Sequence, residues 1–125
     1  MPATNAGRDF VAAAILGEAT TDFNAANAYI GVGDSSTAFA TSQTDLQASS
    51  NKLRKGMNAT YPSRSVNVLT FQTTFIESEA NFAWQEIAVF NAPSGGAMLS
   101  RLVQSLGTKP SSELWRATLT LTLGV

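Results

Sequence analysis

The chain has 125 residues and a mass of 13.2 kDa, which predicts a single domain. Its net charge of −1 gives no electrostatic reason to expect a nucleic acid or an anionic membrane as a partner. The sequence has no cysteine and no histidine, which excludes disulfides, thiolate catalysis and Ser-His or Cys-His nucleophiles, and removes the commonest zinc ligands. Only 14% of the residues are charged, below the usual ~25%, so we expect much of the surface to face other protein.

The sequence also carries no sign of membrane insertion or export. No apolar run approaches the ~18 residues that a membrane-spanning helix needs. The first residues lack the basic stretch followed by an apolar stretch that marks a secretory signal. We therefore expect a soluble protein made in the cytoplasm.

Residues 1–27 are expected to form an N-terminal arm with one short helix. The apolar spacing of RDFVAAAILGEA predicts that helix over residues 8–16, with Asn5 or Gly7 as the N-cap and Gly17 at its end. The polar stretch TTDFNAANA then connects the arm to the rest of the chain.

Residues 28–125 are expected to form one β domain. YIGVG predicts a strand at 29–33, and a long loop with a possible helical turn near 36–46 follows it. Segment 97–107 fits either a helix or a strand, but Gly95-Gly96 and the β-rich neighbours favour a strand. Further strands are predicted at 52–61, 65–78 and 82–92.

The last strand has the clearest pattern in the chain. WRATLTLTL alternates strictly between apolar and polar residues, which is typical of an antiparallel strand with one buried face. Trp84 and Trp115, both on predicted strands, are expected in the core. Turn signals recur every 8–12 residues without a βαβ rhythm, which predicts a mainly β fold, an antiparallel β-sandwich or small barrel with a short N-terminal helix. The side chains expected on the inner face of the last strand are Trp115, Ala117, Leu119, Leu121 and Leu123.

The stretch GVGDSST after the first strand has some likeness to a phosphate-binding loop. A Walker loop would need a glycine and a lysine where the chain has Ser36 and Thr37, and a dinucleotide-binding loop would also need a glycine at position 36. We therefore interpret Gly31 and Gly33 as the corner at which the strand bends away, and we expect no nucleotide cofactor.

The carboxylates give no catalytic or metal-binding pattern. Glu77, Glu79 and Glu86 could in principle form a glycosidase pair, but the cleft-sized scaffold and sugar-stacking aromatic residues that accompany such a pair are missing. We interpret them as solvated charges at strand ends. Asp34 and Asp45 lack the spacing of a calcium-binding loop. We therefore expect no catalytic residue, no metal and no cofactor, and hence no enzyme.

Half of the eight basic residues lie in KLRKGM and shortly after it. Because the net charge is slightly negative and few aromatic residues are interleaved, a protein partner or a solvated face fits this cluster better than a nucleic acid. The candidate interface residues are Arg8 and Phe10 in the arm, with Lys52, Arg54, Lys55 and Arg64 in the β domain.

The order of several segments resembles small structural proteins of tailed bacteriophages. These segments are AYIGVGDSSTAFATSQTDL, RKGM followed by YP, TFIESEANFAWQEIAVFNA, GGAMLSRLVQSLGTKP and a final tryptophan-containing strand. The resemblance covers about residues 28–123 and includes no catalytic motif. It implies a β-sandwich component of the virion, either a capsid decoration (cement) protein or a tail or tail-fibre-associated module that binds a receptor.

Within that resemblance, decoration fits this chain better than a fibre. A fibre needs a length-giving repeat, and the chain has no Gly-x-y, heptad or β-helix repeat. The resemblance implies the major capsid protein and further copies of the chain, as a homotrimer, as partners, with no small-molecule substrate. We expect the protein on the capsid surface of the virion, where it binds and stabilises the assembled shell after synthesis in the host bacterial cytoplasm. The alternative is a tail or tail-fibre-associated structural or receptor-binding module. A carbohydrate-binding module, which would need an exposed aromatic platform, is a further alternative.

Overall fold

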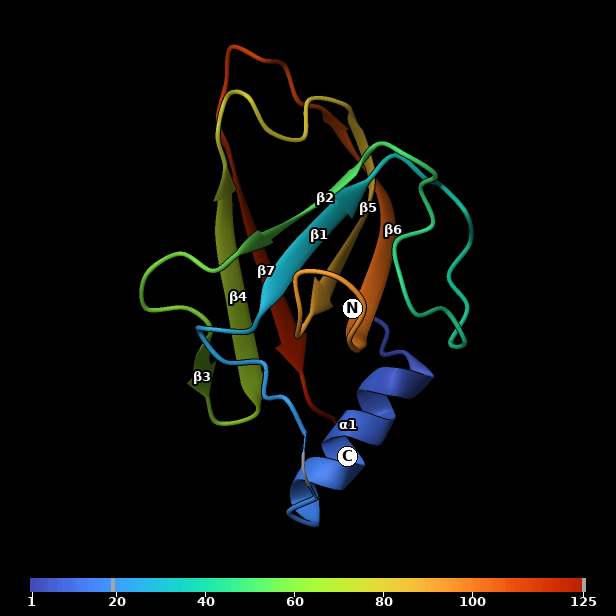
Figure 1. Cartoon of the computed structure of the whole chain (residues 1–125), viewed down its shortest axis with the longest axis vertical. Helices are drawn as coiled ribbons and strands as arrows, with labels where there is room; N and C mark the ends of the chain where they lie inside the picture. Colours follow the sequence, from blue (N-terminus) through green and yellow to red (C-terminus); the bar gives the residue numbers. More distant parts are fainter. Residues whose placement is uncertain (19, 125) are drawn as a thin grey trace.

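The computed structural model describes residues 1–18 and 20–124 (Figure 1). Within these residues one helix precedes seven strands. Their order is α1 (Asn5–Ile15), β1 (Tyr29–Gly33), β2 (Lys52–Gly56), β3 (Ser63–Ser65), β4 (Val68–Phe75), β5 (Ala83–Phe90), β6 (Met98–Thr108) and β7 (Trp115–Thr122).

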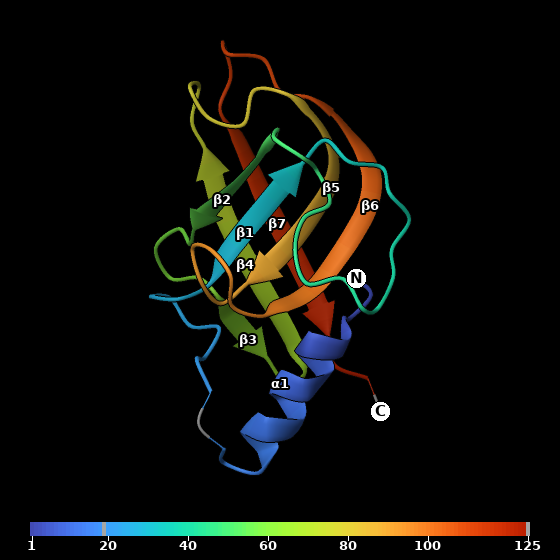
Figure 2. The same cartoon turned by 45° about the vertical axis from the view of Figure 1, so that its right-hand side comes forward.

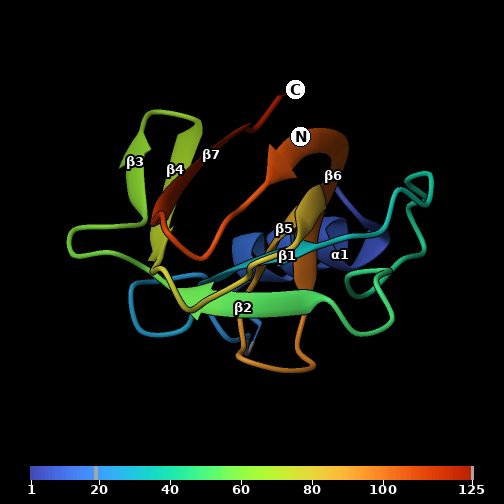
Figure 3. The ribbon, with the colours of Figure 1, turned by 90° about the horizontal axis from the view of Figure 1, so that it is seen from above.

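The strands form two antiparallel sheets. One sheet has four strands in the order β2-β1-β5-β6, and the other has three in the order β3-β4-β7. Figure 3 shows them as two layers, with β3, β4 and β7 on one side and the larger sheet on the other. The predicted fold class, a mainly β antiparallel sandwich with a short N-terminal helix, is therefore confirmed.

The alternation of β7 places its apolar side chains between the sheets. Ala117, Leu119 and Leu121 are buried, whereas the intervening arginine and threonines are exposed. Leu119 pairs with Phe71 of β4, so the apolar faces of the two strands coincide. Such cross-strand pairs are the basic stabilising unit of a sheet.

Three aromatic rings continue the core towards one end of the sandwich. Trp84 packs edge-to-face against both Phe75 and Trp115, with ring centroids 5.2 Å and 5.1 Å apart. Trp84 is buried and Trp115 is half-buried. The core position predicted for Trp84 is confirmed, and Trp115 contacts the core while keeping one side accessible.

The prediction that Leu123 shares the inner face of the last strand is wrong. β7 ends at Thr122, and 41% of the surface of Leu123 is exposed. The backbone of Leu123 instead exchanges hydrogen bonds with Asn67, whose carbonyl accepts at 2.8 Å and whose side chain donates at 2.8 Å. Asn67 lies in the turn between β3 and β4, at the end of the three-stranded sheet. The apolar side chain of Leu123 therefore lies beyond the core.

The helix begins three residues earlier than predicted, because Thr4 caps it. Thr4 is buried and extended, and its hydroxyl accepts from the Gly7 N–H at 2.9 Å while donating to the Met98 carbonyl. Ala3 also bridges to Ser100 of β6. A threonine N-cap satisfies a free backbone N–H of the first turn. The start of the arm is thus docked on the edge of β6.

Two further boundaries differ from the predicted ones. Within the expected strand over 65–78, the structure has only β4 at Val68–Phe75, and a turn in which Val66 has a φ of 55° separates β4 from the short β3 at Ser63–Ser65. The expected strand over 52–61 ends at Gly56.

Two other segments were predicted less definitely. Residues 34–47 form bends and turns but no helical turn. Segment 97–107 is a strand, as the flanking glycines indicated.

Gly31 and Gly33 lie inside β1 and do not form a corner. A Cβ on Gly31 would press against Phe90 and Leu46, and a Cβ on Gly33 would collide with the carboxylate of Glu86. The interpretation as a bend was therefore wrong. The glycines allow other parts of the chain to approach the outer side of β1 closely.

Candidate functional site

The loop of residues 34–51 covers the outer face of the four-stranded sheet. Figure 2 shows it crossing in front of β5 and β6. Leu46 from this loop is buried with Ala88, Phe90 and Met98 in a second apolar cluster, separate from the core between the sheets. The large sheet is therefore buried on both faces in this region.

The interpretation of Glu86 as a solvated strand-end charge is wrong. Glu86 and Arg101 both have 0% exposed side chains, and Glu86 Oε1 lies 2.7 Å from Arg101 Nε. The two Glu86 oxygens also accept the backbone N–H groups of Gln47 and Ala48, each at 2.8 Å. Arg101 Nη1 donates to the side chain of Gln43 at 3.0 Å. The buried pair therefore holds the covering loop onto the sheet.

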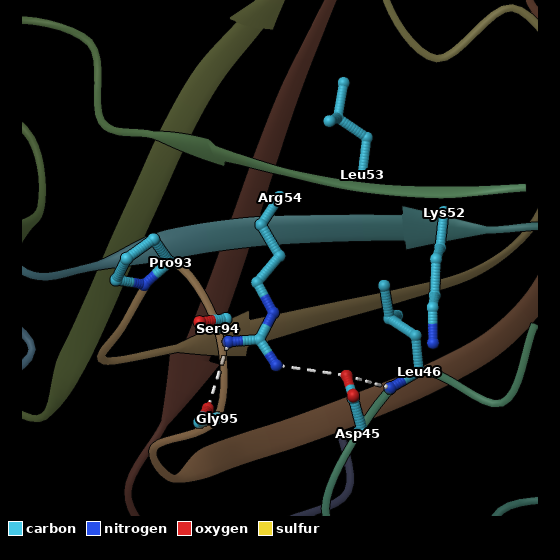
Figure 4. A pocket seen from close by; sticks show the side chains of 8 residues that line it. All are labelled: Asp45, Leu46, Lys52, Leu53, Arg54, Pro93, Ser94 and Gly95. Atoms are coloured by element: carbon cyan, nitrogen blue, oxygen red, sulfur yellow. Dashed lines mark hydrogen bonds and ion pairs between the residues drawn. The ribbon is translucent and has the colours of Figure 1, made fainter. Parts of the chain in front are cut away.

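Arg54 fastens the same loop at a second point (Figure 4). Its guanidinium donates to the carbonyls of Ala92 and Gly95 at 2.8 and 3.0 Å, and to Asp45 Oδ1 at 3.0 Å. The group also lies 3.5 Å from the ring centroid of Phe90, a cation–π contact. Arg54 is thus committed to internal contacts, beside a shallow hollow of about 290 Å³.

Lys55 forms an ion pair with Glu79. Its ammonium lies 2.7 Å from both carboxylate oxygens of Glu79. The hydrogen bond from Lys55, together with the backbone N–H of Ile76, holds the pKa of Glu79 below its ordinary value of 4.5. Glu77 is exposed.

The remaining predicted interface residues lie on separate elements. Lys52 on β2 and Arg8 on α1 are exposed, while Arg64 on β3 is exposed and donates to the carbonyl of Val66 at 3.0 Å. Phe10 packs edge-to-face on Phe23, with centroids 4.8 Å apart. The structure therefore does not bring the six residues together into one surface; α1 and β2 lie in different parts of the molecule (Figure 1).

The arrangement of charged groups offers no metal centre among residues 1–18 and 20–124, where no three acidic side chains converge. Within the same residues, no helix has both the length and the apolar character needed to cross a membrane.

Four of the exposed apolar side chains lie towards one end of the sandwich, and we name these four the apolar end. It consists of Ile15, Leu16, Val66 and Leu123, which are 78%, 75%, 83% and 41% exposed. Ile15 and Leu123 border a common hollow of about 320 Å³ beneath α1. The hydrogen bonds between Asn67 and Leu123 hold the turn that contains Val66 next to Leu123. Figure 1 places α1, the β3–β4 turn and the C-terminal segment towards the same end of the long axis, while Figure 3 shows that α1 lies on the side of the larger sheet and the turn on the side of the smaller one.

Sequence reasoning did not identify the apolar end. The helical segment FVAAAIL has apolar residues around most of its circumference, which is more than one buried face requires, and this was an available signal. Val66 and Leu123 gave no such signal, because their exposure depends on where the opposing sheet ends.

Comparisons of the chain with protein-family models, with curated proteins and with solved structures found no match.

Proposed function

We propose that this protein is a non-enzymatic structural component of a bacteriophage particle that binds the assembled capsid shell as a decoration protein. The observation that carries the proposal is the apolar end, where Ile15, Leu16, Val66 and Leu123 are all exposed. The resemblance of the segment order to phage structural proteins is the reason for proposing a phage shell as the partner of this surface.

Exposed apolar groups of this kind favour a protein partner. Apolar side chains that gather on one face of a small domain mark interaction sites, because burying them removes apolar surface from water. The low charge content of the chain points the same way, since charged residues are depleted at the centres of protein interfaces.

The helix that carries Ile15 and Leu16 is fixed to β6 at its N-terminal end. Thr4 caps α1 from a buried position and Ala3 bridges to Ser100 of β6. Gly7 sits so close to the Leu99 carbonyl that any side chain there would collide with it. A surface that is already ordered loses less conformational entropy when it binds, which favours docking.

In this proposal the protein stabilises the shell by mass action. A ligand that binds the assembled state and not the free subunits shifts the equilibrium towards the assembled state. The protein would then act without catalysis, from the outer surface of the capsid.

Co-sedimentation with empty shells of the cognate major capsid protein tests the proposal. The wild-type protein should bind saturably. The double variant Ile15→Lys/Leu16→Lys should bind about tenfold more weakly or worse, and lysine at the end of a helix is compatible with its dipole. Ile76→Lys, at an exposed isoleucine outside the apolar end, is the matched control and should bind normally. Absence of wild-type binding, or equal binding of the double variant, would overturn the proposal.

The proposal includes self-association as a homotrimer. Light scattering of the free protein, and of protein released from shells, should then give a mass three times that of the 13.2 kDa chain in at least one of the two samples. A monomer mass in both samples would contradict the homotrimer. Shell binding would still be tested by co-sedimentation.

A further inference from the structure

The two sheets leave one side of the sandwich open between β6 and β7. Along Trp115–Thr122, β7 pairs with β4, and its other edge bears no strand within the described residues. β6 pairs with β5 and is likewise the last strand of its sheet. Both strands therefore present unpaired backbone N–H and C=O groups to the same gap, and edges of this kind pair readily with another extended chain.

A groove of about 330 Å³ occupies part of this gap. Its walls are mainly apolar and include Leu102 and Leu106 from β6, and Trp115 and Leu119 from β7. Arg116 also borders the groove, is exposed, and forms no ion pair with any described residue.

In the rest of the gap, the free edge of β6 already pairs with another extended segment. Ala3 pairs antiparallel with Ser100, the Arg101 N–H donates to the Pro2 carbonyl at 3.3 Å, and the Thr4 N–H donates to the Leu99 carbonyl at 3.2 Å. The chain's own N-terminal segment thus lies as an added extended segment on the first half of β6. By this register Met1 lies level with Leu102, the residue at which the groove begins.

We propose that an extended segment of the shell subunit lies in this groove and continues, along β6, the line that residues 2–4 begin. Apolar side chains at alternate positions of the segment face Leu106 and Trp115, because successive side chains of a strand point to opposite faces. An acidic side chain of the segment pairs with Arg116. The inference rests on the proposed function and adds a second contact, of the strand-addition type, to the docking of the apolar end.

The absence of cysteine from the chain allows a direct test. Leu106→Cys introduces a single thiol in the groove, at a side chain that is already 37% exposed. Ser78→Cys, at an exposed position in the β4–β5 loop, is the matched control. Each variant is treated with a maleimide, first free and then bound to empty shells, after circular dichroism has verified the fold. Shell binding should slow modification of the thiol at position 106 by about tenfold or more and leave the thiol at position 78 unchanged, since reactivity follows access.

A maleimide-linked photo-crosslinker on the same thiol identifies the occupant. Mass spectrometry of the crosslinked, shell-bound protein should give a shell-subunit peptide with alternating apolar residues, and Arg116→Glu should weaken shell binding. Normal co-sedimentation with an unprotected thiol at position 106 would refute the groove contact and leave the proposed function standing. A crosslink to a second copy of the chain would refute the assignment to the shell. Failure to co-sediment at all would overturn both.

Discussion

Arg101 Nε and Glu86 Oε1 lie 2.7 Å apart, and neither side chain is exposed to solvent. Glu86 also accepts two backbone N–H groups from the loop of residues 34–51, and Arg101 donates to Gln43 in the same loop. The pair therefore acts as an internal anchor for a long segment that has no regular secondary structure. Removing one member leaves the other charge buried and uncompensated, which is far more costly than losing an exposed ion pair.

Arg101→Met should destabilise the protein by about 3–5 kcal/mol, because it leaves the Glu86 carboxylate buried without its cation. Urea denaturation followed by tryptophan fluorescence measures the loss. Arg116→Met, on the exposed face of β7, is the control and should leave the free energy of unfolding nearly unchanged. Equal stabilities of the two variants would contradict the anchoring role of the pair.

Gly33→Ala should cost about 1–3 kcal/mol, as overpacking a buried site does. The added methyl group would meet the Glu86 carboxylate, which the loop contacts hold in place. Gly56→Ala is the matched control, because a Cβ there meets only the Tyr29 ring at an ordinary 3.8 Å. Thermal unfolding of both variants compares them, and a Gly33→Ala protein as stable as Gly56→Ala would show that β1 has room for a side chain.

Leu121→Ala should destabilise by about 2–5 kcal/mol and Leu123→Ala by much less. Leu121 is buried between the sheets, whereas Leu123 belongs to the exposed apolar end. Chemical denaturation of both variants gives the comparison. Similar losses for the two leucines would mean that the alternation of β7 continues into the core beyond Thr122.

The ion pair of Lys55 and Glu79 should make stability depend weakly on pH. The hydrogen bond from Lys55 lowers the pKa of Glu79 below 4.5 in the folded protein. The contribution is therefore fully present above pH 4.5 and is lost as the pH falls through the lowered pKa. Glu79→Gln should cost about 0.2–1 kcal/mol at pH 7, as partly exposed pairs do. The difference between the variant and the wild type should shrink below pH 4.5, and a difference that stays constant down to pH 2 would contradict this assignment.

The sequence was most informative where a local pattern determines the structure. The alternation of WRATLTLTL predicted β7 and the burial of Leu119 and Leu121, because one face of that strand is covered and the other is not. The glycines before segment 97–107 correctly favoured a strand where apolar spacing alone fitted a helix as well.

Features that depend on distant segments were not predictable in this way. Glu86 was expected to be solvated, because nothing near it in the sequence shows that residues 43–48 fold back over β5. The near-continuous apolar run IAVF that follows Glu86 was a partial signal, since a strand covered on both faces loses its alternation. The exposure of Leu123 likewise depends on where the sheet ends.

Electron cryo-microscopy of empty shells, incubated with and without the protein, shows directly whether it decorates the assembled shell. Decoration should add density of the size of this domain at symmetry-related positions on the outer surface, with α1 and the Val66 turn facing the shell. Shells that show no added density at saturating protein, or protein found only on tails, would contradict it.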